Sequence, residues 1–119
     1  MITGAHVILF VPDAAATRAF FRDVLSLPAV DAGDGWLIFA LPPAELAAHP
    51  TDGDVAHELY LMCDDLQATM AELRDKGAEF VGEPRERDWG TVVSLRVPGG
   101  GTLALYEARH ASPLASAGE

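Results

Sequence analysis

The sequence predicts a mixed α+β fold built from two βαβββ units. At two places an apolar, strand-like run is followed by an acidic residue and then by apolar residues at helical spacing. An offset of 52 residues pairs Asp13 with Asp65 and Arg22-Asp23 with Arg74-Asp75, which indicates an internal duplication. The chain has 119 residues, of which 50% are hydrophobic and 22% charged, so it suits a single globular domain over 1–119.

The first unit is expected over residues 4–50. Its opening strand, 5–11, ends at Pro12, and Asp13 is a typical helix N-cap. A helix over 14–25 follows, because Ala16, Phe20 and Val24 repeat every four residues, and Pro28 prevents its continuation.

A hairpin comes next, with strands 29–32 and 36–41 around the turn at 33–35. Pro42-Pro43 ends the second strand. Residues 44–49 favour either a further short strand or one helical turn.

The second unit, 56–108, repeats this order. A strand over 57–63 leads to the N-cap Asp65 and a helix that ends at Gly77. Then come a strand over 79–81, a charged loop over 83–88, a strand over 89–97, a glycine turn at 99–101 and a last strand over 102–107. Residues 110–119 are expected to be a frayed tail.

The charge balance excludes several partners. With 18 acidic and 8 basic residues the net charge is −10, which repels a phosphate backbone, so nucleic acid is not expected. The apolar runs are too short to cross a bilayer and the N-terminus lacks signal-peptide features, so we expect a cytoplasmic protein without membrane contact. The lone Cys63 is expected to be a small core residue and not a nucleophile.

The order of these elements resembles the vicinal oxygen chelate superfamily, which includes glyoxalase I, bleomycin-resistance proteins and extradiol dioxygenases. The resemblance rests on residues 6–11 before Asp13, the helix 20–25, the entry 58–66 and the turn 98–101, and it covers nearly the whole chain. It implies a cupped mixed β-sheet with helices on the outer face, metal ligands on the first and last strands of each unit, and a homodimer.

The resemblance places the first metal ligand on His6 and its second-half equivalent on Glu58, each seven residues before the helix cap. Strand alternation puts Glu58 on the cavity face and His57 on the helix face, unless a bulge shifts the strand. In the first half the last-strand equivalent is Glu45, with His49 on the same face if that segment is extended.

The family's acidic ligand on the final strand falls on Ala104, which cannot bind a metal. Glu107 has the opposite parity, and we expect it to be a solvated strand end. The ligand set is therefore incomplete at Ala104.

Two functions follow. The first is a metal-free small-molecule site in the cup, as in the bleomycin-resistance branch, with His6 and Glu58 as polar anchors. A hydrogen bond between these two side chains would satisfy both of them without a metal. Its predicted lining is Ile8, Phe10, Tyr60, Met62, Ala104 and Tyr106, with Trp36 and Trp89 closing the mouth.

The alternative is a lyase, isomerase or dioxygenase that acts on substrates with vicinal oxygens. It would use a divalent metal (Ni²⁺, Zn²⁺, Mn²⁺ or Fe²⁺) held by His6, Glu45 and Glu58, with His49 as a fourth donor. The sequence does not identify which residues would be catalytic. In the charged loop, Arg87 could reach an acidic ligand.

Overall fold

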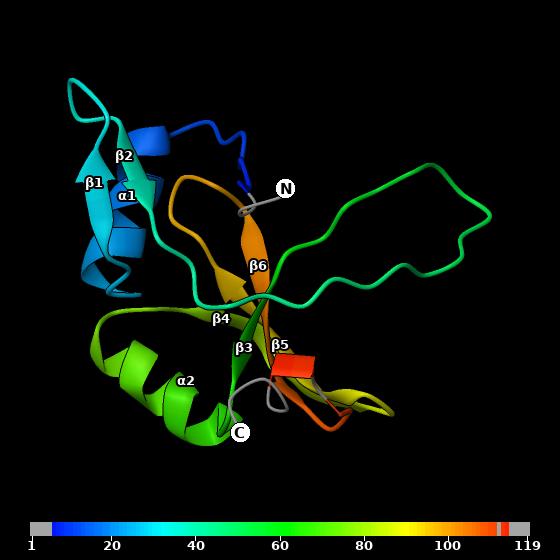
Figure 1. Cartoon of the computed structure of the whole chain (residues 1–119). Helices are drawn as coiled ribbons and strands as arrows, with labels where there is room; N and C mark the ends of the chain where they lie inside the picture. Colours follow the sequence, from blue (N-terminus) through cyan, green and yellow to red (C-terminus); the bar gives the residue numbers. More distant parts are fainter. Residues whose placement is uncertain (1–5, 112, 115–119) are drawn as a thin grey trace.

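The computed structural model describes residues 6–111 and 113–114 (Figure 1). Its elements, in chain order, are α1 (Ala14–Asp23), β1 (Ala29–Asp31), β2 (Leu37–Phe39), β3 (Tyr60–Cys63), α2 (Leu66–Asp75), β4 (Phe80–Arg87), β5 (Gly90–Arg96) and β6 (Thr102–Ala108). The mixed α+β class is confirmed. The second unit is a complete βαβββ set, from β3 to β6.

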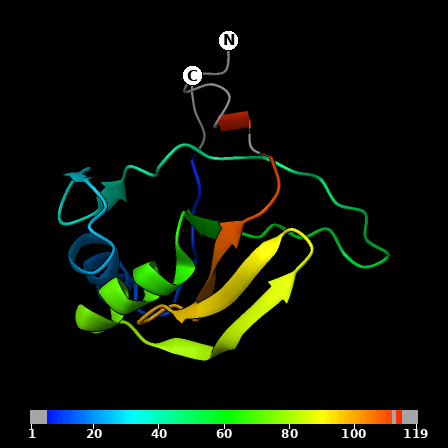
Figure 2. The same cartoon turned by 90° about the horizontal axis from the view of Figure 1, so that it is seen from below.

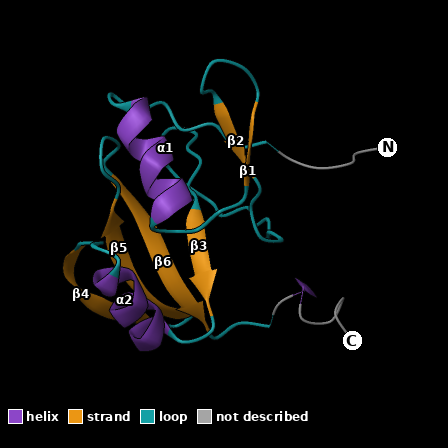
Figure 3. Cartoon of the chain, turned by 90° about the vertical axis from the view of Figure 1, so that its left-hand side faces the viewer, coloured by secondary structure: helices purple, strands orange, loops and turns teal. Residues whose placement is uncertain are grey.

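The strands form two sheets. The larger has four strands in the order β3-β6-β5-β4, with β3 parallel to β6 and the other pairs antiparallel. The smaller is the antiparallel hairpin β1-β2, whose turn at 33–35 lies where the glycines predict it. Both helices lie on one side of the larger sheet (Figures 2 and 3), so its other side is left open.

The core lies between the helices and the larger sheet. It is built from apolar side chains that helical spacing and strand alternation direct toward the same layer. The buried members are Phe20, Leu66, Met70, Leu73, Ala78, Val93, Leu95, Val97 and Leu105.

Acidic side chains cap both helices. Asp13 accepts a hydrogen bond from the Ala16 amide and Asp65 accepts one from the Ala68 amide, each at 3.0 Å, which confirms the two predicted N-caps. The expectation that Glu107 is a solvated strand end was wrong. Its Oε1 accepts a 2.8 Å hydrogen bond from the Leu66 amide. The helix α2 has four amides without intrahelical partners at its start, and Glu107 satisfies one of them.

The prediction of a charged loop at 83–88 was wrong, because most of these residues belong to β4. Arg85, Glu86 and Arg87 pair in register with Val92, Thr91 and Gly90 of β5, after an irregularity that begins at Val81. Because β4 is the last strand of the sheet, its charged side chains can reach water from the edge, and such charges also discourage pairing with another chain.

Two expected strands do not form. Within the expected strand 5–11, residue 5 lies outside the described residues, and residues 6–11 are extended without strand pairing. Residues 44–49 are neither strand nor helix and belong to a long segment, 40–59, that contacts the larger sheet at Glu45 and also forms a loop that extends away from it (Figures 1 and 2). An extended segment becomes a strand only when a neighbouring strand accepts its hydrogen bonds, and neither segment has such a neighbour within the described chain.

The helices α1 and α2 have ten residues each, and in the described part of the chain no helix has the length and apolar character to cross a bilayer.

Candidate functional site

The open face of the larger sheet carries the residues that strand alternation predicts. Tyr60 pairs with Ala104 and Met62 pairs with Tyr106 across β3 and β6, so these four side chains share one face. The alternate residues Leu61 and Cys63 pack against the core on the other face. The predicted alternation along β3 and β6 is therefore confirmed.

Three rings on this face form what we call the aromatic cluster: Tyr60, Trp89 and Tyr106. Their centroids are 6.0 Å (Tyr60–Trp89), 5.5 Å (Tyr60–Tyr106) and 5.4 Å (Trp89–Tyr106) apart, with interplanar angles of 80–82°. Edge-to-face pairs of this kind add about 0.5–1.5 kcal/mol each beyond the burial of area. Tyr106 is 8% exposed, whereas Tyr60 and Trp89 are both 37% exposed. The cluster therefore exposes the aromatic side chains of Tyr60 and Trp89 to solvent, while Tyr106 is buried.

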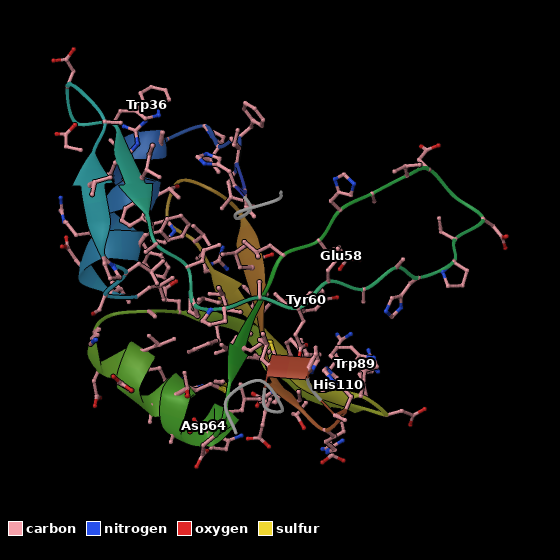
Figure 4. All side chains as sticks on the ribbon, in the orientation of Figure 1. Trp36, Glu58, Tyr60, Asp64, Trp89 and His110 are labelled. Atoms are coloured by element: carbon pink, nitrogen blue, oxygen red, sulfur yellow. The ribbon has the colours of Figure 1, made fainter. Side chains whose placement is uncertain are left out.

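Glu58 lies at the rim of the aromatic cluster (Figure 4). Its Oε2 accepts a 2.7 Å hydrogen bond from the Tyr60 hydroxyl, so its partner is Tyr60 and not the expected His6. This hydrogen bond to the carboxylate, with a smaller contribution from burial, raises the pKa of the Tyr60 hydroxyl.

Glu45 reaches the aromatic cluster from the long segment 40–59. The Tyr106 hydroxyl lies 3.4 Å from Glu45 Oε1 and 3.3 Å from Nε2 of His110. His110 Nε2 is in turn 3.6 Å from Glu45 Oε1, and its Nδ1 is 2.9 Å from the Ala111 carbonyl oxygen. Burial, followed by the nearby Glu45 carboxylate, raises the pKa of Tyr106.

One oxygen of this group is unsatisfied. Glu45 Oε2 is buried and has no hydrogen-bond partner among the described residues, and the Glu45 side chain as a whole is 15% exposed. A buried carboxylate oxygen without a donor is costly, so this atom needs a hydrogen-bond donor that the described residues do not supply.

His110 is a site residue that the sequence analysis missed, because its position in the expected frayed tail concealed it. The strand β6 is prolonged beyond Ala108 by a 2.9 Å hydrogen bond from the Arg109 amide to the Trp89 carbonyl. The Arg109 guanidinium also donates to the Arg87 carbonyl at 2.9 Å and to Thr91 Oγ1 at 2.8 Å. The polar pair Arg109-His110, directly after the last strand, was the available signal.

Other predicted site residues lie elsewhere. His6, Ile8 and Phe10 are exposed in the extended segment 6–11, and His49 is exposed in the segment 40–59. Trp36 stacks with the Arg18 guanidinium at 4.6 Å and lies far from Trp89 (Figure 4), so within this chain the two tryptophans do not close a common mouth.

The predicted metal donors do not converge within the chain. Among residues 6–111 and 113–114, no three His, Cys, Asp or Glu side chains form a group that could hold a metal ion. Glu45 is directed at Tyr106 and His110, while Glu58 is bound by Tyr60. A divalent metal of the expected kind needs three or four convergent donors, so we derive no metal-dependent step from this arrangement.

Cys63 behaves as the small core residue that the sequence predicts. It packs against the core, and its Sγ lies 3.5 Å from the Tyr106 carbonyl oxygen. Burial raises the pKa of the Cys63 thiol, which keeps it in its unreactive, protonated form.

Comparisons with known proteins complete the description of the site. Residues 4–105 match the family model of the "Glyoxalase/Bleomycin resistance protein/Dioxygenase superfamily". A stretch of 45 residues is 36% identical to "Uncharacterized protein YetH" of Bacillus subtilis (strain 168) and spans 38% of each protein.

The solved structures that are similar in fold include the following two proteins. The antibiotic binding protein TnmS3 from Streptomyces sp. CB03234 has a TM-score of 0.61 and 24% identity over 91% of this chain and 99% of that chain. Lactoylglutathione lyase from Agrobacterium tumefaciens has a TM-score of 0.63 and 20% identity over 88% of this chain and 92% of that chain.

Proposed function

The chain belongs to the Glyoxalase/Bleomycin resistance protein/Dioxygenase superfamily, and we propose that it binds a small aromatic or apolar molecule on the open face of its larger sheet. The observation that carries the proposal is the aromatic cluster, which exposes the rings of Tyr60 and Trp89 beside two carboxylates. Ligand sites typically combine such apolar surface with a few polar groups that fix orientation.

The neighbouring side chains suit a flat ligand. Met62, which is 40% exposed on the same face, can adapt its flexible side chain to the ligand's shape. The mutual edge-to-face packing holds the rings in place, so little side-chain entropy is lost on binding. Because TnmS3 shares the fold and is described as an antibiotic binding protein, hydrophobic antibiotics are the first ligands to test.

We also propose that the chain forms a homodimer. Its accessible surface is 8924 Å², against about 6,200 Å² for a compact monomer of 12.6 kDa. The segments 6–11 and 40–59 carry large apolar side chains that are almost fully exposed, such as Phe10 (92% exposed), Leu46 (100%) and Val55 (90%). A second copy would cover about the area that obligate dimers bury, which is roughly 2,000 Å² or more in total.

Dimerisation bears on the polar anchors. In an extended segment His6, Ile8 and Phe10 share one face, because alternate residues point the same way. We propose that the dimer orders this segment against a sheet, so that His6 joins Glu58 as an anchor of the site. A His6→Ala variant that dimerises and binds ligand like the wild type would remove His6 from the proposal.

A thermal-shift screen of aromatic small molecules and hydrophobic antibiotics, with hits measured by titration calorimetry, tests the binding proposal. Tyr60→Ala and Trp89→Ala should each abolish detectable binding, because they remove the exposed rings. Trp36→Ala is the matched control, because Trp36 is exposed but distant from the cluster, and it should bind like the wild type. Equal losses in all three variants would contradict the proposed site.

A metal-dependent lyase, isomerase or dioxygenase is the second candidate. It is favoured by a nitrogen and an oxygen donor, on His110 and Glu45, that lie 3.6 Å apart beside the unsatisfied Glu45 Oε2. Elemental analysis of untagged protein, followed by calorimetric titration with Ni²⁺, Zn²⁺, Mn²⁺ and Fe²⁺, separates the candidates. Stoichiometric metal that is lost in Glu45→Gln would support the second candidate and displace the first.

A further inference from the structure

The group formed by Glu45, Tyr106 and His110 has more hydrogen-bond acceptors than donors. The Ala111 carbonyl oxygen can only accept, so the His110 Nδ1 that lies 2.9 Å from it carries a hydrogen. In a neutral ring Nε2 is then an acceptor. The Tyr106 hydroxyl has one hydrogen to donate, yet it faces both His110 Nε2 at 3.3 Å and Glu45 Oε1 at 3.4 Å. Two acceptors therefore compete for one hydrogen.

The second carboxylate oxygen of Glu45 is a further acceptor without a donor. Glu45 Oε2 is buried and lacks a hydrogen-bond partner in the described part of the chain. A carboxylate in this position needs a donor, and a positively charged donor satisfies it best, because charge-assisted hydrogen bonds are about twice as strong as neutral ones.

Among the described residues, no arginine donates to Glu45. Arg109 is held by the Arg87 carbonyl, Thr91 and Glu86. Arg85 pairs with Val92 and so lies on the open face, but it belongs to β4, two strands or about 10 Å from β6. The open face is therefore negative on the side of β3 and β6 and positive on the side of β4.

The rings beside Glu45 are also suited to a cation. Tyr60 and Trp89 are partly exposed, and the faces of their rings carry the negative part of the aromatic quadrupole. Glu58 adds a second carboxylate at the rim through its bond to Tyr60. A net charge of −10 attracts cations to the chain as a whole.

We infer that the ligand of this face is an organic cation, with an ammonium group placed beside Glu45 and an apolar or aromatic body that covers the exposed rings of Tyr60 and Trp89. The inference rests on the proposed small-molecule site and adds the charge and chemical class of the ligand. The unsatisfied oxygen of Glu45 and the partly exposed rings of Tyr60 and Trp89 are the two observations that carry it.

The test compares three probes with the same aromatic body: the benzylammonium cation, whose N–H groups can donate to Glu45, neutral benzyl alcohol and the phenylacetate anion. A Trp36→Phe background leaves Trp89 as the sole tryptophan, so that its fluorescence reports binding at the cluster. We expect the cation to bind at least about fivefold more tightly than benzyl alcohol, as cation–π contact and charge pairing require, and phenylacetate to bind most weakly.

Glu45→Gln should reduce the affinity for the cation to that for benzyl alcohol. Its amide can donate to His110 or Tyr106, so the melting temperature should not fall, which distinguishes loss of a ligand contact from loss of structure. Glu72→Gln is the matched control, since it removes the same charge from the exposed face of α2 and should leave binding unchanged.

Three results would overturn the inference. Equal affinities for the cation and benzyl alcohol, unchanged in Glu45→Gln, would mean that Glu45 does not select a charged ligand, while the aromatic site itself would stand. Tightest binding of phenylacetate would assign the ligand to the β4 side. No response to any of the three probes would reject the cation, and the antibiotic screen would then decide the small-molecule site separately.

Discussion

The hydroxyl of Tyr106 lies 3.4 Å from Glu45 Oε1, although 61 residues separate the two in sequence. Tyr106 is in the middle of β6, at the centre of the aromatic cluster, whereas Glu45 belongs to a segment without regular structure. The contact brings a largely buried carboxylate of the long segment 40–59 onto the open face of the larger sheet. The first prediction tests this contact directly.

Tyr106→Phe should lower the free energy of unfolding by about 1 kcal/mol or more, because it leaves Glu45 without its hydroxyl donor. Tyr60→Phe is the matched control: it also removes one hydroxyl from the cluster, but the partner Glu58 is exposed, so water can replace the bond. Urea denaturation measures both variants. A larger loss in Tyr60→Phe than in Tyr106→Phe would show that Glu45 does not depend on Tyr106.

Glu107→Ala should destabilise the protein by about 1–2 kcal/mol, the usual cost of a lost helix cap, because the Leu66 amide at the start of α2 loses its acceptor. Glu79→Ala removes a carboxylate that pairs with Arg96 at 3.5 Å on the surface, and it should cost about 0.5 kcal/mol or less. Thermal or urea unfolding measures both variants. Equal losses of unfolding free energy in Glu107→Ala and Glu79→Ala would contradict the role of Glu107 at the start of α2.

The tyrosine pKa values predict how stability depends on pH. Both Tyr60 and Tyr106 have a raised pKa in the folded chain, whereas unfolded tyrosine titrates near pH 10. Above about pH 10 the unfolded state loses protons that the native state retains, so the free energy of unfolding should fall as pH rises through the folded-state pKa values. Below about pH 10 these groups contribute no pH dependence.

Ultraviolet titration of tyrosinate measures the same effect. Glu58→Gln should shift the pKa of Tyr60 back toward its ordinary value, because the negative acceptor is removed. A titration curve that is identical in wild type and Glu58→Gln would argue against the Glu58–Tyr60 hydrogen bond.

The proposed dimer gives a further prediction. Analytical ultracentrifugation should find a mass near twice 12.6 kDa, and a Phe10→Ser, Leu46→Ser double variant should shift the equilibrium toward monomer. Both residues are almost fully exposed in the single chain, so the change cannot act by loosening its core. Val30→Ser, at an exposed position of β1, is the control and should stay dimeric. A monomeric wild type would contradict the proposal.

These elements also show what could be predicted from the sequence. The caps at Asp13 and Asp65 and the shared face of Tyr60 and Met62 could be predicted, because each depends only on residues that are close in sequence. The roles of Glu107 and His110 depend on contacts with residues that are distant in sequence or on the path of the chain after β6, which composition does not reveal.

The segments 6–11 and 44–49 illustrate a different limit. Each has apolar residues typical of a strand or helix, but pairing needs a partner that one chain does not supply. In β4 the opposite occurred: three charged residues that are typical of a loop became an edge strand because β5 was available as a partner.

The most direct test of the proposed site follows the indole N–H resonances of both tryptophans by NMR while benzylammonium is added to the wild-type protein. The Trp89 resonance should shift and saturate as the ligand covers the aromatic cluster, while the Trp36 resonance should stay in place. A shift of the Trp36 resonance alone would place binding outside the open face of the larger sheet and contradict the central claim.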